Sequence, residues 1–140
     1  MTQSPPDLKT VRLVLVEDSD SDVFLLTDAA QQLLYDLRIR RFNTAPRAID
    51  GLEDAMNDSP DGVLLDLNLP GGSGLDVLRA IRDSVRCRNL RVVVMTSSLS
   101  GRDREAAERL GIQGYLIKSS DLNEFVRALD SVLRQFSTRS

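Results

Sequence analysis

Short apolar runs alternate with longer amphipathic segments along the whole of this chain. The clearest run covers residues 11–16 and is interrupted only by Arg12. Continuous apolar runs of this length are typical of parallel strands that are covered on both faces of a sheet. The pattern predicts five strands, at residues 11–16, 39–42, 62–66, 91–96 and 115–117.

Each predicted strand is followed by a segment in which apolar residues recur every three to four positions, which indicates an amphipathic helix. Residues 19–22 are rich in capping side chains, Pro46 suits a helix start, and Asp121 suits a cap of the last helix. We interpret Asp20 and Asp22 as caps and dipole partners of the first helix rather than as ligands. The predicted helices cover residues 23–37, 46–58, 75–85, 101–110 and 122–136.

The apolar stripes of these helices predict which side chains cover the sheet. On the last helix we assign Leu122, Phe125, Leu129 and Leu133 to the core, so that only Val132 is left to face a partner. The stripes of the other helices are expected at Ala48, Ile49, Leu52, Ala55 and Met56, at Leu75, Leu78, Ile81 and Val85, and at Ala106, Ala107 and Leu110.

Five strand–helix units in succession predict an α/β fold with a doubly wound, five-stranded parallel sheet of the flavodoxin-like (βα)5 type. We expect a polar leader at residues 1–10, one domain at residues 11–136 and a short tail at residues 137–140. A chain of 140 residues has room for one domain of ordinary size.

Composition excludes several classes of function. With 18 basic and 21 acidic residues the chain offers no bulk attraction to nucleic acid or to an anionic membrane. Histidine is absent, which excludes a Ser-His-Asp hydrolase, a His-ligated zinc centre and a phosphohistidine on this chain. Cys87 is a lone cysteine in a polar stretch and is expected as a free thiol. No signal sequence or membrane span is recognisable, so we expect a cytoplasmic protein.

Polar side chains stand where the predicted strands end. Glu17 and Asp18 follow the first strand, Asp66 ends the third and opens a loop rich in glycine, Thr96 ends the fourth and Lys118 follows the fifth. Open parallel sheets carry their chemistry at the carboxyl ends of the strands. Three carboxylates that meet there require a divalent cation, and hard oxygen ligands suit Mg²⁺.

The same residues suggest a reaction. Asp66 is ionised at neutral pH and can act as a nucleophile toward phosphorus, while the cation offsets charge in a loose in-line transition state. Lys118 can pair with Asp66 and then with a phosphate oxygen, and the Thr96 hydroxyl can donate to another.

These motifs resemble those of the receiver domain of bacterial response regulators, over about residues 11–136. The resemblance is carried by Glu17-Asp18, by the segment 66–70 with Gly74, and by Thr96, Tyr115 and Lys118. It implies a single-domain, chemotaxis-like regulator that takes a phosphoryl group on Asp66 from a sensor histidine kinase and catalyses only its own phosphorylation and dephosphorylation. It also implies Glu17, Asp18, Asp66 and the backbone carbonyl of Asn68 as metal ligands, and Thr96 and Tyr115 as the switch.

Lys118-Ser119 stands where the family usually has Lys-Pro, which raises the question of whether Lys118 is placed as usual. This pair is similar to that of the phytochrome-associated single-domain regulators, which would make a bacterial phytochrome the kinase.

Two other functions share part of this pattern. An aspartyl phosphatase of the haloacid-dehalogenase type needs a second acid two residues after its nucleophile, where this chain has Asn68. A receiver fold that acts only as an interaction module, without phosphorylation, stays open.

The output is expected to be association with another protein, first of all a homodimer through the fourth helix, fifth strand and fifth helix. A two-fold contact needs a self-complementary patch, and the fourth helix carries charges of both signs, at Arg102, Asp103, Arg104, Glu105, Glu108 and Arg109.

Overall fold

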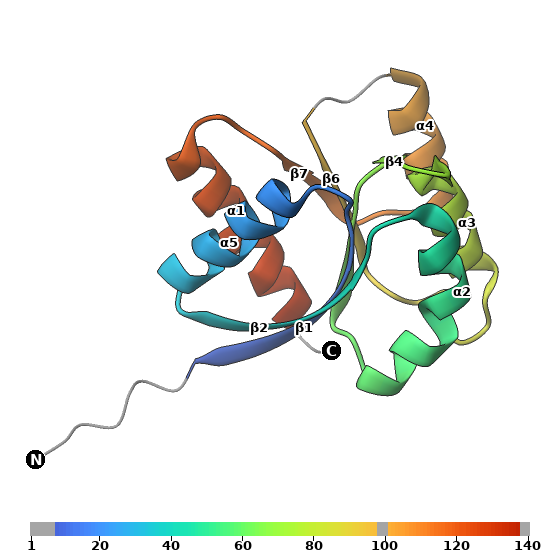
Figure 1. The fold of residues 1–140 in the computed structure, drawn as a ribbon, viewed down its shortest axis with the longest axis horizontal. Helices are drawn as coiled ribbons and strands as arrows, with labels where there is room; N and C mark the ends of the chain where they lie inside the picture. The colour runs from blue at the N-terminus through green and yellow to red at the C-terminus, as the bar shows by residue number, and fades with distance from the viewer. Residues whose placement is uncertain (1–7, 98–100, 138–140) are drawn as a thin grey trace, which may run out of the picture.

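Five parallel strands form a central sheet with helices on both faces, as Figure 1 shows. The computed structural model describes residues 8–97 and 101–137. The elements are β1 (Lys9–Val16), α1 (Asp20–Gln32), β2 (Tyr35–Phe42), α2 (Ala45–Ala55), the 3₁₀ turn η1 (Met56–Asp58), β3 (Gly62–Leu65), the short strands β4 (Asn68–Leu69) and β5 (Gly72–Ser73), α3 (Gly74–Asp83), β6 (Val92–Thr96), α4 (Gly101–Leu110), β7 (Gly114–Ile117) and α5 (Leu122–Ser137).

The sheet order is β2-β1-β3-β6-β7, and each neighbouring pair is parallel. The chain therefore winds outward in both directions from the β1–β3 pair, which makes that pair the topological switch point of the sheet. This confirms the predicted doubly wound fold. The polar leader is only partly covered by the described residues, and residues 138–140 of the predicted tail lie outside them.

Two apolar layers enclose the sheet. On one face, α1 and α5 cover Val11, Leu13 and Leu15 of β1, and on the other face α2, α3 and α4 cover Val14 and Val16. Alternate residues of one strand thus enter opposite layers, as the pleat of a strand requires. Both faces of β1 and β3 are buried, which explains why their sequences read as unbroken apolar runs.

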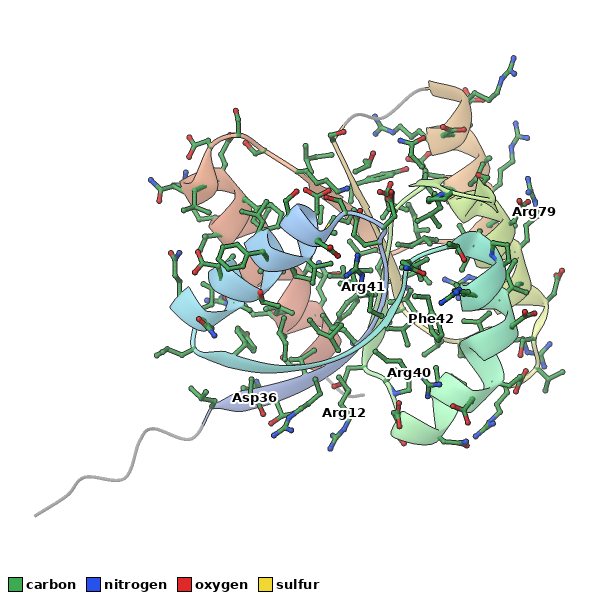
Figure 2. The ribbon with its side chains drawn as sticks, viewed as in Figure 1. Arg12, Asp36, Arg40, Arg41, Phe42 and Arg79 are labelled. Atoms are coloured by element: carbon green, nitrogen blue, oxygen red, sulfur yellow. The ribbon has the colours of Figure 1, made fainter. Side chains whose placement is uncertain are left out.

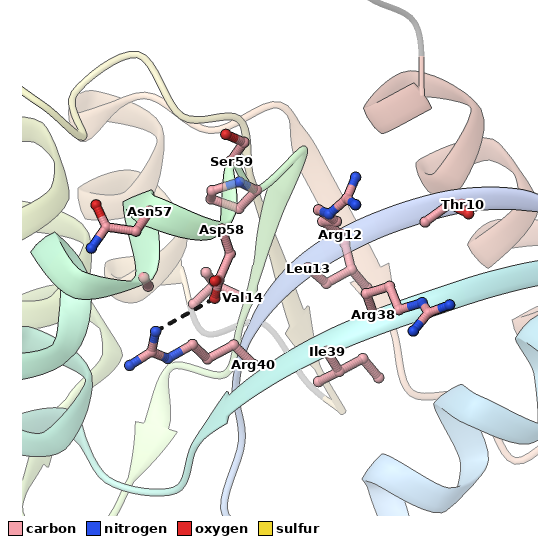
Figure 3. Close-up of a pocket in the computed structure, with 12 residues that line it drawn as sticks. Thr10, Arg12, Leu13, Val14, Arg38, Ile39, Arg40, Asn57, Asp58 and Ser59 are labelled. Carbon is pink, nitrogen blue, oxygen red and sulfur yellow. Dashed lines mark hydrogen bonds and ion pairs between the residues drawn. The ribbon is translucent and has the colours of Figure 1, made fainter.

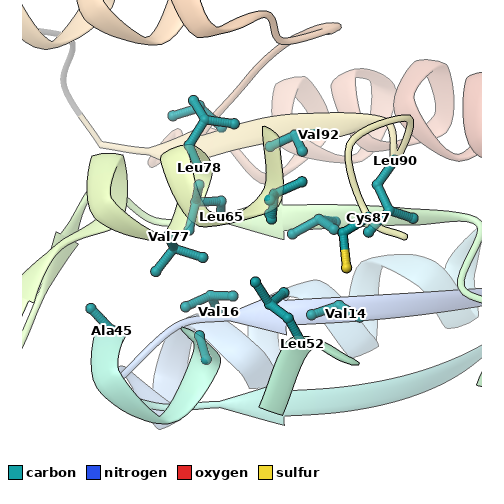
Figure 4. Packing of buried hydrophobic residues seen from close by; sticks show 14 of the residues in the cluster. Val14, Val16, Ala45, Leu52, Leu65, Val77, Leu78, Cys87, Leu90 and Val92 are labelled. Atoms are coloured by element: carbon teal, nitrogen blue, oxygen red, sulfur yellow. The ribbon is translucent and has the colours of Figure 1, made fainter. Parts of the chain in front are cut away.

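The segment after α3 places Cys87, which was predicted as a free thiol in a polar stretch, in the interior of the fold. The chain turns back at residues 84–90, where the backbone N–H of Cys87 donates to Ser84 O at 3.2 Å. This turn carries Cys87 inward, and its side chain is fully buried beside Leu52 and Leu90 (Figure 4). Val85, which we assigned to the inner face of the helix, is 79% exposed because α3 has already ended at Asp83. Nothing in the sequence indicates this burial, because the residues on both sides of Cys87 are polar.

The boundary between α1 and β2 lies earlier than predicted. The helix ends at Gln32, and Leu34 adopts a left-handed conformation (φ 61°) that reverses the chain. β2 then begins at Tyr35 and pairs with β1 over eight residues. Leu37, which is the last residue of the predicted helix 23–37, packs instead from the strand onto the layer of α1 and α5. Leucines spaced by three to four fit either element over so short a distance.

Most of the residues assigned to the core on α5 and α2 are buried as predicted, but individual positions differ. On α5, Val132 is buried at 5% exposure and Leu122 is 40% exposed, so Val132 belongs to the core and Leu122 to the surface. On α2, Ile49 is partly exposed at 37%. Residues at the end of a helix and at the edge of a stripe reach past the sheet, which sequence periodicity does not show. Asp121 accepts from the first backbone N–H groups of α5, as expected of a cap, and Pro46 lies in the first turn of α2, whose N-cap is Thr44.

Arg82 holds the C-terminal end of α4, which is the end farther from the carboxyl edge of the sheet, in place. Its guanidinium donates to the carbonyls of Leu110, Gly111, Arg88 and Leu90 at 2.6–3.2 Å. Burial lowers the pKa of Arg82. One side chain thus joins α3, the turn before β6 and the end of α4 through backbone acceptors alone. Within the described residues, no helix is long and apolar enough to cross a membrane.

Candidate functional site

The acidic cluster forms because β1 and β3 are neighbours in register. Val16 pairs with Leu65, and the N–H of Asp66 donates to Val16 O at 2.9 Å. Glu17 and Asp18 therefore leave β1 beside the point where Asp66 leaves β3. One carboxylate oxygen from each of these three acids lies within 4.8 Å of the others. The sequence prediction that three carboxylates meet at one edge of the sheet agrees with this geometry.

The three acids differ in exposure. Glu17 is fully buried, Asp66 is 5% exposed and Asp18 is open to solvent. Burial raises the pKa of the Glu17 carboxyl above its ordinary value, and the nearby charge of Asp66 raises it further, against the lowering effect of Lys118. The site thus holds a buried acid that is costly to ionise without a cation nearby.

Lys118 extends from the end of β7 into this cluster. Its Nζ lies 2.8 Å from Glu17 Oε2, 2.8 Å from Asp22 Oδ2 and 3.2 Å from Asp66 Oδ2. Burial alone would lower the pKa of Lys118, but the carboxylates of Asp22 and Glu17 and the charge of Asp66 raise it well above its ordinary value. The ammonium is therefore permanently charged at neutral pH.

The Lys118-Ser119 bond is trans, because the described residues contain no cis peptide bond. Lys118 nevertheless reaches Asp66, and its backbone N–H donates to Thr96 O at 2.8 Å. The missing proline has not displaced the lysine.

Asp22 is the residue that sequence reasoning missed at this site. The N-cap of α1 is Ser19, whose hydroxyl accepts from the N–H of Asp22, and Asp20 pairs with Arg41 at 2.7 Å. Asp22 uses its carboxylate to bind Lys118 instead. Its position one turn into an amphipathic helix gave no signal of this contact, because the partner is 96 residues away in the chain.

The loop after Asp66 is held tightly against the site. Asn68 donates its N–H to Asp66 Oδ1 at 2.9 Å, and β4 and β5 form a short antiparallel hairpin that leads into α3. A Cβ on Gly74 would lie 2.2 Å from Asp66 O, so only glycine allows this approach. Asn68 thereby orients one carboxylate oxygen, while its own carbonyl stays a predicted ligand.

The predicted switch residues lie on the neighbouring strands. Thr96 is the buried last residue of β6, and Tyr115 lies on β7 against α4. The Tyr115 hydroxyl donates to Glu108 at 3.1 Å, and the Arg104 guanidinium lies 5.6 Å from the centre of its ring. Burial and the bond to Glu108 raise the pKa of Tyr115. Tyr115 is thus tied to α4 in this conformation.

The donor set fits a hard divalent cation. Glu17 Oε2 is buried and, although it lies 2.8 Å from Lys118 Nζ, it accepts no hydrogen bond of good geometry. Asp18 makes no hydrogen bond or ion pair within the described residues, and only oxygen atoms face the cluster from these acids. Carboxylate oxygens with free coordination positions are what Mg²⁺ and Mn²⁺ require.

A hollow of about 830 Å³ lies at the opposite, amino-terminal edge of the sheet (Figure 3). Arg12, Arg38 and Arg40 line it, but Arg40 is paired with Asp54 and Asp58, and Arg38 with Asp36. Figure 2 places Arg12 and Asp36 apart from Arg41. The Arg41 guanidinium belongs to the other end of the sheet, where it donates to the backbone carbonyl of Glu17 at 3.0 Å. The hollow is therefore separate from the site.

Comparison with known proteins agrees with the fold. The model of the response regulator receiver domain matches residues 13–130. The probable methanogenesis regulatory protein FilR2 of Methanothrix harundinacea is 33% identical over 86% of this chain and 79% of its own length. The transcriptional regulatory protein PrrA of Mycobacterium tuberculosis is 34% identical over 87% of this chain, which spans half of PrrA.

Solved structures of similar proteins include several phytochrome response regulators. Phosphorylated cyanobacterial RcpA has a TM-score of 0.77 at 27% identity, covering 88% of this chain and 91% of its own. The Mn²⁺-bound form of Rcp1 has a TM-score of 0.74 at 28% identity, with coverages of 87% and 91%. The bacteriophytochrome response regulator AtBRR has a TM-score of 0.70 at 29% identity, with coverages of 96% and 99%.

A doubly wound sheet with an acidic triad and a lysine at its carboxyl edge defines a receiver-type protein. This chain belongs to the response regulator receiver domain family of two-component systems.

Proposed function

We propose that the protein is a phosphorylation-controlled switch in which a sensor histidine kinase donates a phosphoryl group to Asp66 in the presence of Mg²⁺. The observation that carries the proposal is the contact of Lys118 Nζ with Asp66 Oδ2 at 3.2 Å beside the carboxylates of Glu17 and Asp18. A nucleophile, a fixed cation and a set of metal ligands are what phosphoryl transfer requires.

In the transfer, an Asp66 carboxylate oxygen forms a bond to phosphorus as the bond from phosphorus to the imidazole nitrogen of the kinase breaks. Glu17, Asp18, Asp66 and the carbonyl of Asn68 would hold the Mg²⁺, which supplies positive charge to the phosphoryl oxygens. Lys118 neutralises a further oxygen, and Asn68 N–H keeps the Asp66 carboxylate oriented. The protein thus acts on itself rather than turning over a separate substrate.

The output of the switch is association. Thr96 moves toward the phosphoryl oxygens, Tyr115 repacks, and the surface of α4, β7 and α5 changes and binds a second copy of the chain. Similarity to the phytochrome response regulator RcpA and the bacteriophytochrome response regulator AtBRR supports a bacterial phytochrome as the partner kinase.

Incubation with acetyl phosphate and Mg²⁺ tests the proposal. Intact mass should increase by one phosphoryl group that is labile to base, and Asp66→Asn or chelation of Mg²⁺ should abolish the increase. A modified peptide that contains Asp18 instead of Asp66 would overturn the assignment. A protein that takes no phosphoryl group from acetyl phosphate or from a kinase, yet still binds a partner, would favour the interaction module.

A further inference from the structure

The ammonium of Lys118 is shared between the predicted phosphorylation site and helix α1. Asp22 Oδ2 lies 2.8 Å from Lys118 Nζ, whereas Asp66 Oδ2 lies 3.2 Å from it. Asp22 is itself fixed by its helix, because its N–H donates to the hydroxyl of Ser19. The lysine is therefore held at least as closely by α1 as by Asp66.

These contacts close into a ring. Ser19 N–H donates to Glu17 Oε1 at 3.1 Å, the Ser19 hydroxyl accepts from Asp22 N–H at 3.3 Å, Asp22 accepts from Lys118, and Lys118 returns to Glu17 Oε2. The ring links the end of β1, the first turn of α1 and the end of β7. Among the described residues, Asp22 makes no hydrogen bond or ion pair with the acids of the cluster, Glu17, Asp18 and Asp66. Its charge therefore acts on the site through Lys118 and through space.

We propose that Asp22 is a positioning residue that holds the charge of Lys118 toward α1 and so restrains phosphoryl transfer to Asp66. The inference rests on the proposed function and concerns the regulation of that same site. An incoming phosphoryl donor brings anionic oxygens that compete with Asp22 for the one ammonium. The Asp22 carboxylate also adds negative charge beside the donor, which disfavours its approach.

Asp22→Asn separates the two effects of this side chain. The amide oxygen still accepts a hydrogen bond from Lys118, so the lysine keeps a partner, but the competing negative charge is gone. We expect Asp22→Asn to take a phosphoryl group from acetyl phosphate about fivefold faster than the wild type, since a partly exposed charge pair is worth roughly 1 kcal/mol. Asp22→Glu keeps the charge and should load at close to the wild-type rate.

Asp20→Asn is the matched control. Asp20 also lies in the first turn of α1, but it is exposed and pairs with Arg41 rather than with Lys118. The substitution removes one negative charge from the same turn and should leave the loading rate within twofold of the wild type.

Two measurements on the wild type, Asp22→Asn, Asp22→Glu and Asp20→Asn test the role of Asp22. The first is the rate of phosphorylation by acetyl phosphate, followed by intact mass, and the second is the affinity for trifluoroberyllate in the presence of Mg²⁺. Faster loading and tighter trifluoroberyllate binding in Asp22→Asn alone support the inference. Equal or slower loading in Asp22→Asn, with a wild type that loads normally, overturns it and leaves the proposed function intact. A wild type that neither loads nor binds trifluoroberyllate overturns both.

Discussion

Glu17, a predicted metal ligand, illustrates how one buried acid can lower the stability of the fold. Burial and the charge of Asp66 raise its pKa, so the folded protein binds the proton more tightly than the unfolded chain does. A group of this kind stabilises the fold at a pH below its unfolded pKa, and that contribution is lost as the pH rises through the folded pKa. At neutral pH, ionised Glu17 therefore lowers the free energy of unfolding when no cation is bound.

We expect Glu17→Gln to raise the melting temperature of the metal-free protein at neutral pH. The gain should shrink at acid pH, below the ordinary value of 4.5, because wild-type Glu17 is then protonated as well. Addition of Mg²⁺ should stabilise the wild type but not the variant. Thermal unfolding at both pH values, with and without Mg²⁺, measures this; a variant that is less stable at neutral pH without metal would contradict it.

Gly74 determines how close the Asp66 loop can lie to helix α3. A methyl group there would lie 2.2 Å from Asp66 O and 2.6 Å from Leu67 Cα, and backbone atoms cannot rotate away. Gly74→Ala should destabilise the protein by about 2 kcal/mol, typical of overpacking, and should slow phosphorylation because Asp66 shifts. Denaturant unfolding and mass-monitored loading measure the two effects.

The control for this change is Gly114→Ala on β7, where an added Cβ meets nothing within 4 Å. It should change the free energy of unfolding by less than about 1 kcal/mol and leave loading unaffected. Equal effects of both substitutions would mean that loss of glycine flexibility, rather than the contact with Asp66, is responsible.

At the scale of elements, the structure joins the site to helix α4 through two adjacent strands. Thr96 ends β6 and accepts from the backbone of Lys118, while Tyr115 on β7 binds Glu108 of α4. Arg82 fixes the opposite end of α4 to α3. Movement of Thr96 toward a phosphoryl group can therefore change how Tyr115 packs while the far end of α4 stays in place.

Tyrosine fluorescence can follow this movement, because the chain has two tyrosines and no tryptophan. In a Tyr35→Phe background, phosphorylation should change the emission of Tyr115 as its hydroxyl leaves Glu108. Adding Thr96→Ala should preserve the mass increase and abolish the emission change. Should the emission change persist without the Thr96 hydroxyl, Thr96 has no part in the coupling.

At the scale of the whole molecule, the proposed output is a change in oligomeric state. The charges of α4 are only partly available to a partner, because Arg104 and Glu108 pair at 3.2 Å and both contact Tyr115. If Tyr115 repacks, Arg104 and Glu108 lose their contacts with its side chain and become more available to a partner at the surface of α4. A phosphorylated protein is therefore expected to sediment more as a dimer than the unmodified protein does.

Sedimentation velocity with and without acetyl phosphate tests this expectation, and added salt should weaken the dimer because the contact is charged. Arg102→Glu on α4 should reduce dimerisation, whereas Arg47→Glu on α2, outside the proposed surface of α4, β7 and α5, should not. A monomer in both states at high protein concentration would leave binding to another protein as the output.

The sequence by itself determined most of the fold and the list of candidate residues at the site. Short apolar runs, such as the one at Gly62–Leu65, predicted strands that are buried on both faces of the sheet. The polar residues directly after these runs were predicted to lie together at the carboxyl edge of the sheet. This worked because strand ends in a parallel sheet meet at one edge, so a property local in sequence becomes a shared position in space. The roles of those residues in phosphorylation stay predictions.

Only the tertiary structure decided where side chains go when their partners are distant in the chain. From the sequence, Asp22 is interpreted as a cap of α1, but β7 brings Lys118 to it. Cys87 stands in a polar stretch of the sequence, and only the turn after α3 shows that its side chain is buried against α2. Leu122 and Val132 exchanged their expected places for a similar reason. Periodicity specifies which residues share a face of an element, but the neighbouring elements determine how much of that face is covered and which charges meet across it.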